Sequence, residues 1–171
     1  MRNMKKNIVL TGIMGCGKTT IGKKIAAILN MDFLDLDQYI EEKWGRIPDL
    51  FLNGEEYFRD IESLAALEAG NKEHTVIATG GGIIKRDKNI FNLKRNGIAF
   101  FIDRPIEDIL KDIEISERPL LSQGKEKLLN IYKERYHKYI ETCDFHIKNA
   151  RSIENVLDEV ITTWRLKTID K

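Results

Sequence analysis

Residues 12–20 read GIMGCGKTT and match the pattern G-x-x-x-x-G-K-[ST] at every position. In this pattern the glycines let the backbone curl, so that successive N–H groups point into one concavity. A helix that begins there adds the positive end of its dipole, which favours anions. Lys18 can reach the β- and γ-phosphates of a nucleotide, and the Thr19 hydroxyl can hold a magnesium ion. The sequence therefore predicts a site for nucleotide phosphates.

The residues on either side fit the order of strand, loop and helix that this motif requires. A short apolar run at residues 8–10 predicts a buried strand. After the motif, apolar residues recur at helical spacing, at Ile21, Ile25, Ile28 and Leu29. These flanks favour a phosphate loop over a glycine-rich turn that matches by chance.

Composition limits the classes of partner. The 171 residues include 28 Lys+Arg and 27 Asp+Glu, a formal net charge of +1, which indicates neither nucleic acid nor an anionic membrane. No apolar run approaches the length of a membrane span, and the run after the basic first residues is too short for a signal peptide. Cys16 and Cys143 make no disulfide framework, and the three histidines lack zinc-ligand spacing. We expect a reduced, cytoplasmic, monomeric protein.

Strand and helix patterns alternate along the rest of the chain. Short apolar runs predict further strands at residues 33–35, 75–78, 98–102 and 145–147. Helical patterns lie between and after them, at residues 38–44, 54–70, 87–95 and 126–141 and from Ser152, a good N-cap, onward. This alternation implies a parallel sheet with helices on both faces.

Several boundaries follow from single residues. The segment at residues 45–48 breaks the helix before it, and Gly70 is the predicted C-cap of the helix over residues 54–70. That helix is expected to have one apolar face with Phe58, Ile61, Leu64 and Ala65. Pro105 suits the first turn of a helix, and the polar residues 114–125 predict a mobile loop.

Two further segments are expected beside the phosphate loop, because ligands of parallel sheets bind beyond the carboxyl ends of the strands. They are the acidic pair Asp35 and Asp37, and the glycines at residues 80–82. If the strand stays extended, the two aspartates share a face. One could orient magnesium through water, and the other could accept a hydrogen bond from an attacking hydroxyl.

Three arginines complete the predicted site. Arg59 precedes Glu62 by three residues, Arg135 lies near Tyr139 on a helical pattern, and Arg118 falls in the predicted mobile loop. Closure of such a loop can bring an arginine onto the transferring phosphoryl group, an effect worth roughly 10³–10⁵ in rate. The remaining arginines considered are interpreted as surface charges, namely Arg46, Arg86, Arg95 and Arg104.

Together these motifs resemble the shikimate kinase family over nearly the whole chain. They are GxxGxGKT at 12–19, DxD at 35–37, GExxFRxxE at 54–62, GGG at 80–82, RPLL at 118–121 and RxxxY at 135–139, in the family's order. The resemblance implies a three-layer α/β P-loop fold with a five-stranded parallel sheet. It also implies one domain over residues 1–171, with a substrate-binding helical segment at about 35–62 and a lid at about 112–125.

The resemblance also implies an activity: ATP-dependent phosphorylation of shikimate to shikimate 3-phosphate and ADP, with Mg²⁺, in the chorismate and aromatic amino acid pathway. The implied catalytic residues are Lys18, Asp37 and Arg118. The implied nucleotide-binding residues are Gly15, Cys16, Gly17, Lys18, Thr19, Thr20, Lys111, Arg118 and Arg151. Thr19 and Asp35 would hold the metal. The acid would be bound by Asp37, Phe51, Phe58, Arg59, Gly80, Gly81, Gly82 and Arg135.

The sequence departs from the family pattern in two places. Lys111 stands where many members carry an arginine beside the adenine, and a lysine stacks less well on a purine. The segment at residues 51–54 is one residue shorter than usual, and Pro48 is unusual before it. These differences concern nucleotide selectivity and the shape of the acceptor pocket.

Other functions share part of this pattern. Gluconate kinase and nucleoside monophosphate kinases have the same architecture but other acceptors. A GTP-binding switch would need the motifs Asn-Lys-x-Asp and Asp-x-x-Gly. Residues 71–74, NKEH, begin like the first motif but lack its aspartate, and the second motif does not occur in the sequence. A regulatory protein without catalysis would not need Lys18, Thr19 and both aspartates intact.

Overall fold

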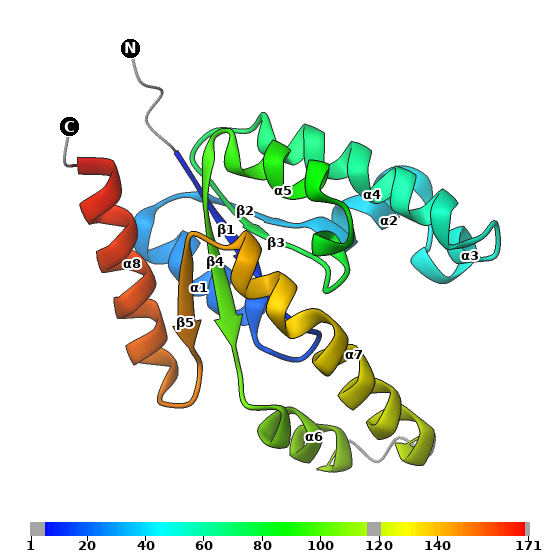
Figure 1. Ribbon diagram of the computed structural model, residues 1–171. Coiled ribbons are helices and arrows are strands. Elements are labelled where there is room, and N and C mark those ends of the chain that lie inside the picture. The colour runs from blue at the N-terminus through cyan, green and yellow to red at the C-terminus, as the bar shows by residue number, and fades with distance from the viewer. Residues whose placement is uncertain (1–5, 116–120, 170–171) are drawn as a thin grey trace.

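The computed structural model describes residues 6–115 and 121–169 and contains one parallel sheet (Figure 1). The strand order is β2-β3-β1-β4-β5. The strands are β1 (Asn7–Thr11), β2 (Asp32–Asp35), β3 (Thr75–Ala78), β4 (Gly97–Asp103) and β5 (Phe145–Lys148). Because β1 pairs with both β3 and β4, the loop after β1 lies beside the segments that follow those two strands.

Helices cover both faces of the sheet, as Figure 1 shows. Helices α1 and α8 pack together on one face, and α5 and α7 pack against β4 on the other. The helices are α1 (Lys18–Leu29), α2 (Leu36–Trp44), α3 (Ile47–Phe51), α4 (Glu55–Gly70), α5 (Asp87–Lys94), α6 (Ile106–Ile115), α7 (Leu121–Thr142) and α8 (Ile153–Ile169). Within the described chain, none of them combines the length and apolarity needed to cross a membrane. The predicted α/β class and five-stranded parallel sheet are confirmed.

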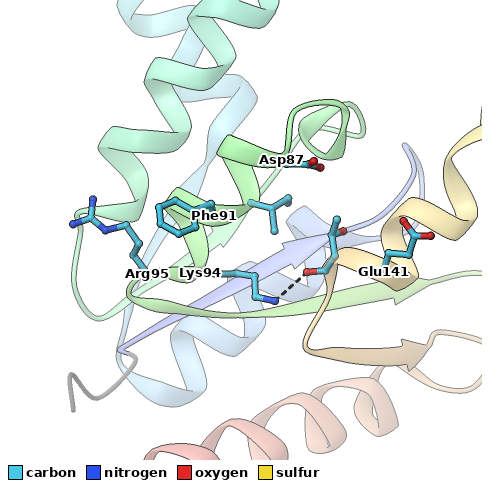
Figure 2. Close-up of a pocket in the computed structure, with 7 residues that line it drawn as sticks. Asp87, Phe91, Lys94, Arg95 and Glu141 are labelled. Atoms are coloured by element: carbon cyan, nitrogen blue, oxygen red, sulfur yellow. Dashed lines mark hydrogen bonds between the residues drawn. The ribbon is translucent and has the colours of Figure 1, made fainter.

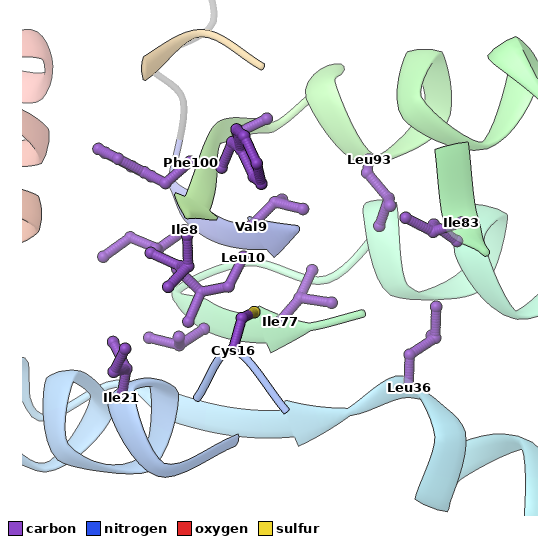
Figure 3. Packing of buried hydrophobic residues seen from close by; sticks show 14 of the residues in the cluster. Ile8, Val9, Leu10, Cys16, Ile21, Leu36, Ile77, Ile83, Leu93 and Phe100 are labelled. Atoms are coloured by element: carbon purple, nitrogen blue, oxygen red, sulfur yellow. The ribbon is translucent and has the colours of Figure 1, made fainter. Parts of the chain in front are cut away.

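The core lies on both sides of the central strands. Every residue of β1 and of β4 is buried, as expected for parallel strands with helices on each face. Figure 3 shows Ile21 of α1 and Leu93 of α5 packing towards the strand residues Ile8 and Val9 from different helices. Burying a side chain of this size contributes about 1.5–3 kcal/mol to folding. The sheet is therefore a rigid base for the loops at its carboxyl edge.

The prediction that Asp35 and Asp37 share an extended strand is wrong. Strand β2 ends at Asp35, whose side chain accepts hydrogen bonds from the backbone N–H groups of Asp37 (3.1 Å) and Gln38 (3.2 Å). Asp35 therefore caps α2, which begins two residues earlier than predicted. Asp37 lies in the first turn of that helix.

The predicted break at residues 45–48 is shorter than expected, because α3 begins at Ile47. Pro48 occupies its first turn, where the missing N–H costs no helical hydrogen bond. Together α2, α3 and the first turns of α4 form a helical segment that extends from the edge of the sheet beyond β2 (Figure 1).

The predicted mobile loop at residues 114–125 is also too long. Helix α6 continues to Ile115 and α7 begins at Leu121, so both described ends of that segment are helical. A glycine such as Gly124 costs a helix only about 1 kcal/mol, and α7 recovers more by burying Leu128.

Helix α4 differs from its prediction in two details. Leu64 is 51% exposed, so the buried face consists of Phe58, Ile61 and Ala65 without it. Gly70 is the last helical residue rather than the C-cap, and a Cβ there would collide with the carbonyl of Asn92. Its lack of a side chain allows α4 and α5 to approach closely.

Candidate active site

The loop after β1 has the backbone that the glycine pattern predicts. Gly12, Gly15 and Gly17 have φ values of 144°, 81° and 102°. A Cβ at Gly12 would come within 2.6 Å of the Ile102 carbonyl oxygen, and one at Gly15 within 2.9 Å of Ile109 Cγ2. No side chain caps the N-terminus of α1, a helix that the structure describes in full. Its first N–H groups are donors that a bound phosphate can satisfy.

A cavity of about 470 Å³ lies in front of this loop. It brings together the phosphate loop, the acidic pair and the glycine segment, which come from three different strands. Its lining residues are Met14, Gly15, Gly17, Lys18, Thr19, Thr20, Asp35, Asp37, Thr79, Gly80, Gly81 and Arg104.

Lys18 is buried and its ammonium group is held by the loop. The Nζ atom donates to the carbonyl oxygens of Gly12 (2.7 Å) and Ile13 (3.0 Å) and lies 3.6 Å from the Cys16 sulfur. To contact a phosphate, the ammonium must exchange these carbonyls for phosphate oxygens, at the same side of the cavity.

Thr19 and Asp35 form a pair of oxygen ligands. The Thr19 hydroxyl donates to Asp35 Oδ2 at 2.8 Å, while Asp35 Oδ1 caps α2. Among the described residues, no three His, Cys, Asp or Glu side chains lie close enough to form a metal site of their own. Mg²⁺ bound to a nucleotide needs few protein ligands, because it keeps phosphate oxygens and waters. This pair therefore fits a magnesium–nucleotide complex.

The first and third glycines of residues 80–82 each lie against one predicted site residue, Asp37 or Arg59. A Cβ at Gly80 would lie 2.6 Å from Asp37 Oδ1, and a Cβ at Gly82 would lie 2.7 Å from Arg59 Nη2. A larger residue at either position would displace the carboxylate or the guanidinium. The glycines are thus required by close approach, since neither has a positive φ.

The middle glycine anchors α7. The Gly81 carbonyl oxygen accepts hydrogen bonds from the Tyr139 hydroxyl (2.6 Å) and from Arg135 Nη1 (3.2 Å). The Arg135 Nε atom is buried and has no hydrogen-bond partner in the part of the chain that the structure describes. Burial raises the pKa of Tyr139 to about 12, so its hydroxyl remains a donor.

Arg59 is fixed by acids and rings. It donates to Glu62 at 2.8 Å and to Glu55 at 3.3 Å, and its guanidinium lies over the Phe58 ring (5.1 Å) and the Phe51 ring (5.9 Å). The two rings stack with their centroids 4.4 Å apart. Burial raises the pKa of Glu62, and Arg59 opposes that shift. The cation is therefore oriented before it meets any substrate.

Asp37 borders the cavity, and its ionised form is disfavoured. Crowding by surrounding protein atoms raises the pKa of this carboxyl, and the charge of Asp35 raises it further. Lys18 acts in the opposite direction. Asp37 is not fully buried, so the rise in its pKa reflects incomplete hydration of the carboxylate.

Within the described chain, three predicted nucleotide-binding residues do not line this cavity, namely Cys16, Lys111 and Arg151. Lys111 is exposed and lies 3.5 Å from Asp108, and Arg151 is exposed just before α8. Arg118 lies outside the described residues. The roles predicted for these four residues remain predictions.

Two residues at the loop were missed by sequence reasoning. Asn149 donates through Nδ2 to the Cys16 carbonyl (3.0 Å), and no motif marked it. The interpretation of Arg104 as a surface charge is wrong, because Arg104 lines the cavity and donates to the Gly15 carbonyl at 3.1 Å. Its position directly after β4, at the carboxyl edge, was the available signal.

A second cavity, of about 400 Å³, lies between α5 and the end of α7 (Figure 2). It contains none of the motifs. Lys94 bonds to the Thr142 carbonyl at 3.2 Å and pairs with Asp144 at 2.8 Å, and Asp87 pairs with Lys138 at 2.7 Å. Lys94 and Asp87 are thus already paired, and the absence of the motifs favours the cavity at the phosphate loop as the active site.

Comparison with known proteins identifies the family of this arrangement. The family model described as shikimate kinase matches residues 14–165. The shikimate kinase of Clostridium botulinum (strain Alaska E43) is 48% identical over 92% of this chain and 96% of its own length. That of Clostridium beijerinckii is 46% identical over 92% of this chain and 94% of its own.

Solved structures agree. Shikimate kinase from Acinetobacter baumannii in complex with shikimate superposes with a TM-score of 0.82 at 34% identity, over 99% of this chain and 96% of that one. Shikimate kinase from Aquifex aeolicus gives a TM-score of 0.77 at 33% identity, over 92% of this chain and 95% of that one.

Proposed function

Since this chain belongs to the shikimate kinase family, we propose specific roles for its residues in the reaction of that family. The enzyme transfers the γ-phosphoryl group of ATP to a hydroxyl of shikimate, giving shikimate 3-phosphate and ADP, with Mg²⁺. One observation carries the assignment of roles. The glycine turn at residues 80–82, beside the phosphate loop, is in contact with the side chains of Asp37, Arg59 and Arg135.

Arg59 and Arg135 bind the carboxylate of the acid. A guanidinium is planar and forms paired, charge-assisted hydrogen bonds with a carboxylate. Arg59 is held in place by Glu62, and the partnerless Nε of Arg135 is a donor that an acceptor oxygen would satisfy. Phe51 and Phe58 supply an apolar wall for the ring.

Asp37 accepts the proton of the attacking hydroxyl. In the transfer, a bond forms between that oxygen and the γ-phosphorus, the bond from phosphorus to the ADP oxygen breaks, and the proton moves to the carboxylate. The raised pKa of Asp37 makes it a better base than an ordinary aspartate.

Lys18 and the loop N–H groups hold the phosphates. Thr19 and Asp35 would hold the magnesium ion, which when bound neutralises charge on the β- and γ-phosphates. Arg118 is proposed to contact ATP from the lid at about residues 112–125, and the segment at about 35–62 to bind the acid.

We further propose that the chain is a single domain and works as a monomer in the cytoplasm. Light scattering after size-exclusion chromatography tests the oligomeric state, and a mass near 19.8 kDa is expected.

Parallel assays test the choice of acceptor. Purified protein with ATP and magnesium is offered shikimate, gluconate and nucleoside monophosphates, and ADP release is followed. Shikimate is expected to support turnover far above the others, and the Asp37→Asn variant should remove it. Turnover with gluconate or a nucleoside monophosphate at equal or higher kcat/KM would refute the assignment.

A further inference from the structure

Arg104 occupies a position between the phosphate loop and helix α6. It follows the last residue of β4, and Figure 1 shows this strand leading directly into α6. Its Nη1 atom donates to the Gly15 carbonyl (3.1 Å) and to Asp112 Oδ2 (2.6 Å). The side chain is about one quarter exposed and lines the same cavity as Thr19 and Thr20.

The guanidinium of Arg104 has hydrogen-bond donors that are not used at this wall of the cavity. Both of its hydrogen bonds come from Nη1, and its other two nitrogens donate to nothing in the described chain. Asp112, in contrast, is well exposed and has water as an alternative partner. Exposed ion pairs of this kind contribute only about 0–1 kcal/mol, so a stronger anion can displace the carboxylate.

We propose that Arg104 is a further nucleotide-binding residue, which binds the phosphates of ATP or ADP and gives up Asp112 when it does so. The inference rests on the proposed function, because it assumes that the cavity takes a nucleotide. Arg104 keeps its bond to the Gly15 carbonyl, so it also holds the loop at the position where the phosphates bind.

The location favours phosphate over the acid as the ligand. Arg104 shares its cavity wall with the loop and with the start of α1, whereas Arg59 and Arg135 do not line this cavity and contact Gly82 and Gly81 instead. Guanidinium also matches phosphate in geometry, through two parallel N–H donors. The loop ammonium, Lys18, is bonded to loop carbonyls, so a second cation at this wall adds to the attraction for a polyanion.

Titration calorimetry of Mg-ADP and of adenosine tests the proposal. The Kd of the weaker ligand is measured by letting the stronger ligand displace it. Arg104→Ala should raise the Kd of ADP about tenfold or more, since a charge-assisted bond is lost, and leave the Kd of adenosine within twofold. Asp112→Asn should lower the Kd of ADP, because the guanidinium is no longer held by a carboxylate. Arg95→Ala removes one positive charge directly after α5, away from the loop, and should change neither constant.

Each contrary result has a clear meaning. If Arg104→Ala leaves the Kd of ADP within twofold, or weakens adenosine equally, the proposal is wrong. If Asp112→Asn leaves ADP binding unchanged or weakens it, Arg104 only ties α6 to the loop. Should Arg104→Ala fail to fold, Arg104→Lys replaces it, with a smaller but still ADP-selective loss expected. Failure of the parent protein to bind Mg-ADP would instead refute the proposed function.

Discussion

Arg59 and Arg135 differ in how the protein holds them, although both are proposed to bind the carboxylate of the acid. Arg59 pairs with Glu62, a carboxylate that is only 2% exposed. Arg135 makes its hydrogen bond to a carbonyl, which carries no formal charge. Removing one partner of a buried ion pair costs about 3–5 kcal/mol, because the other charge is left uncompensated. The two truncations should therefore affect stability differently.

Arg135→Ala is expected to raise the KM for shikimate about 10- to 100-fold with a small change in Tm, since it loses a charge-assisted bond of about 1.5–3 kcal/mol. Arg59→Ala should raise KM similarly and also lower Tm by several degrees. Steady-state kinetics and thermal unfolding of both variants check this. An unchanged KM in both would mean that the acid is bound elsewhere.

Lys18→Ala should abolish most turnover. The ammonium is the buried cation at the phosphate loop, and loss of one such stabilising group costs roughly 10²–10³ in kcat or more. The circular dichroism spectrum should keep the parental shape, because the backbone of the loop is set by its glycines. Near-parental kcat would contradict the role given to Lys18.

Asp37 should show opposite effects on activity and stability. The pKa of Asp37 in the folded protein is raised above the ordinary value of 3.8, so ionisation of this carboxyl opposes folding. The stability that the protonated carboxyl provides is complete below about pH 3.8 and is lost as pH rises through the folded-state pKa. Asp37→Asn should therefore have a higher Tm than the parent at pH 7, and the difference should vanish at about pH 3.8 and below. The same change should remove activity. The parental kcat/KM should fall as pH drops through the raised pKa.

At the scale of elements, α2 depends on a residue that is also proposed to hold the metal ion. Asp35 caps the helix with Oδ1 and accepts the Thr19 hydroxyl with Oδ2. One carboxylate thus orients the first turn of α2, and that turn places Asp37 at the cavity. The start of this helix and the position of Asp37, the proposed base, are coupled.

Two substitutions separate these uses of Asp35. Asp35→Asn keeps a capping oxygen, so Tm should stay near the parental value while the apparent affinity for Mg²⁺ falls. Asp35→Ala loses both, with a further destabilisation of about 1 kcal/mol from the missing cap. Magnesium titrations of activity and urea unfolding distinguish them. Equal stabilities for the two variants would show that the cap contributes little.

The sequence predicted some elements better than others, for physical reasons. Strands β1, β3 and β4 were found because each is a short apolar run buried along its length, as in residues 98–102. The partly buried β2 and β5 were found from shorter apolar runs. The start of α2 was missed because its cap is supplied by the last residue of a strand, which periodicity does not reveal. The start of α7 was missed because polar residues and Gly124 concealed a helix that packing stabilises.

At the scale of the whole molecule, strand order brings the site together. The phosphate loop follows β1 and the glycine turn follows β3, and these strands are direct neighbours. Sequence motifs marked several of the residues that line the cavity, among them Lys18, Thr19 and Asp37. They did not reveal that residues 80–82 contact Asp37, Arg59 and Arg135, nor that Arg104 lines the cavity, because such contacts depend on packing between distant segments.

Ligand binding should stabilise the whole fold. At a concentration of 100 times its Kd, Mg-ADP should add about 2.7 kcal/mol to the free energy of unfolding. For a chain of this size that corresponds to a rise in Tm of about 5–11 °C. Thermal shift measurements check this. Lys18→Ala should lose the shift caused by Mg-ADP but keep the shift caused by shikimate, and Arg135→Ala should show the reverse.

The attachment of α7 to the Gly81 carbonyl fixes the C-terminal part of that helix to the site, while its N-terminal part packs against α6. Measured along the axis from Tyr139, Arg135 is about 6 Å away and Leu121 about 27 Å. If α7 tilts with Tyr139 as its pivot, the far end sweeps more than four times the arc of the turn that carries Arg135. The helix is then a lever: the turn with Arg135, the proposed shikimate ligand, stays nearly in place, while the far end moves together with α6, which lies against the phosphate loop through Ile109.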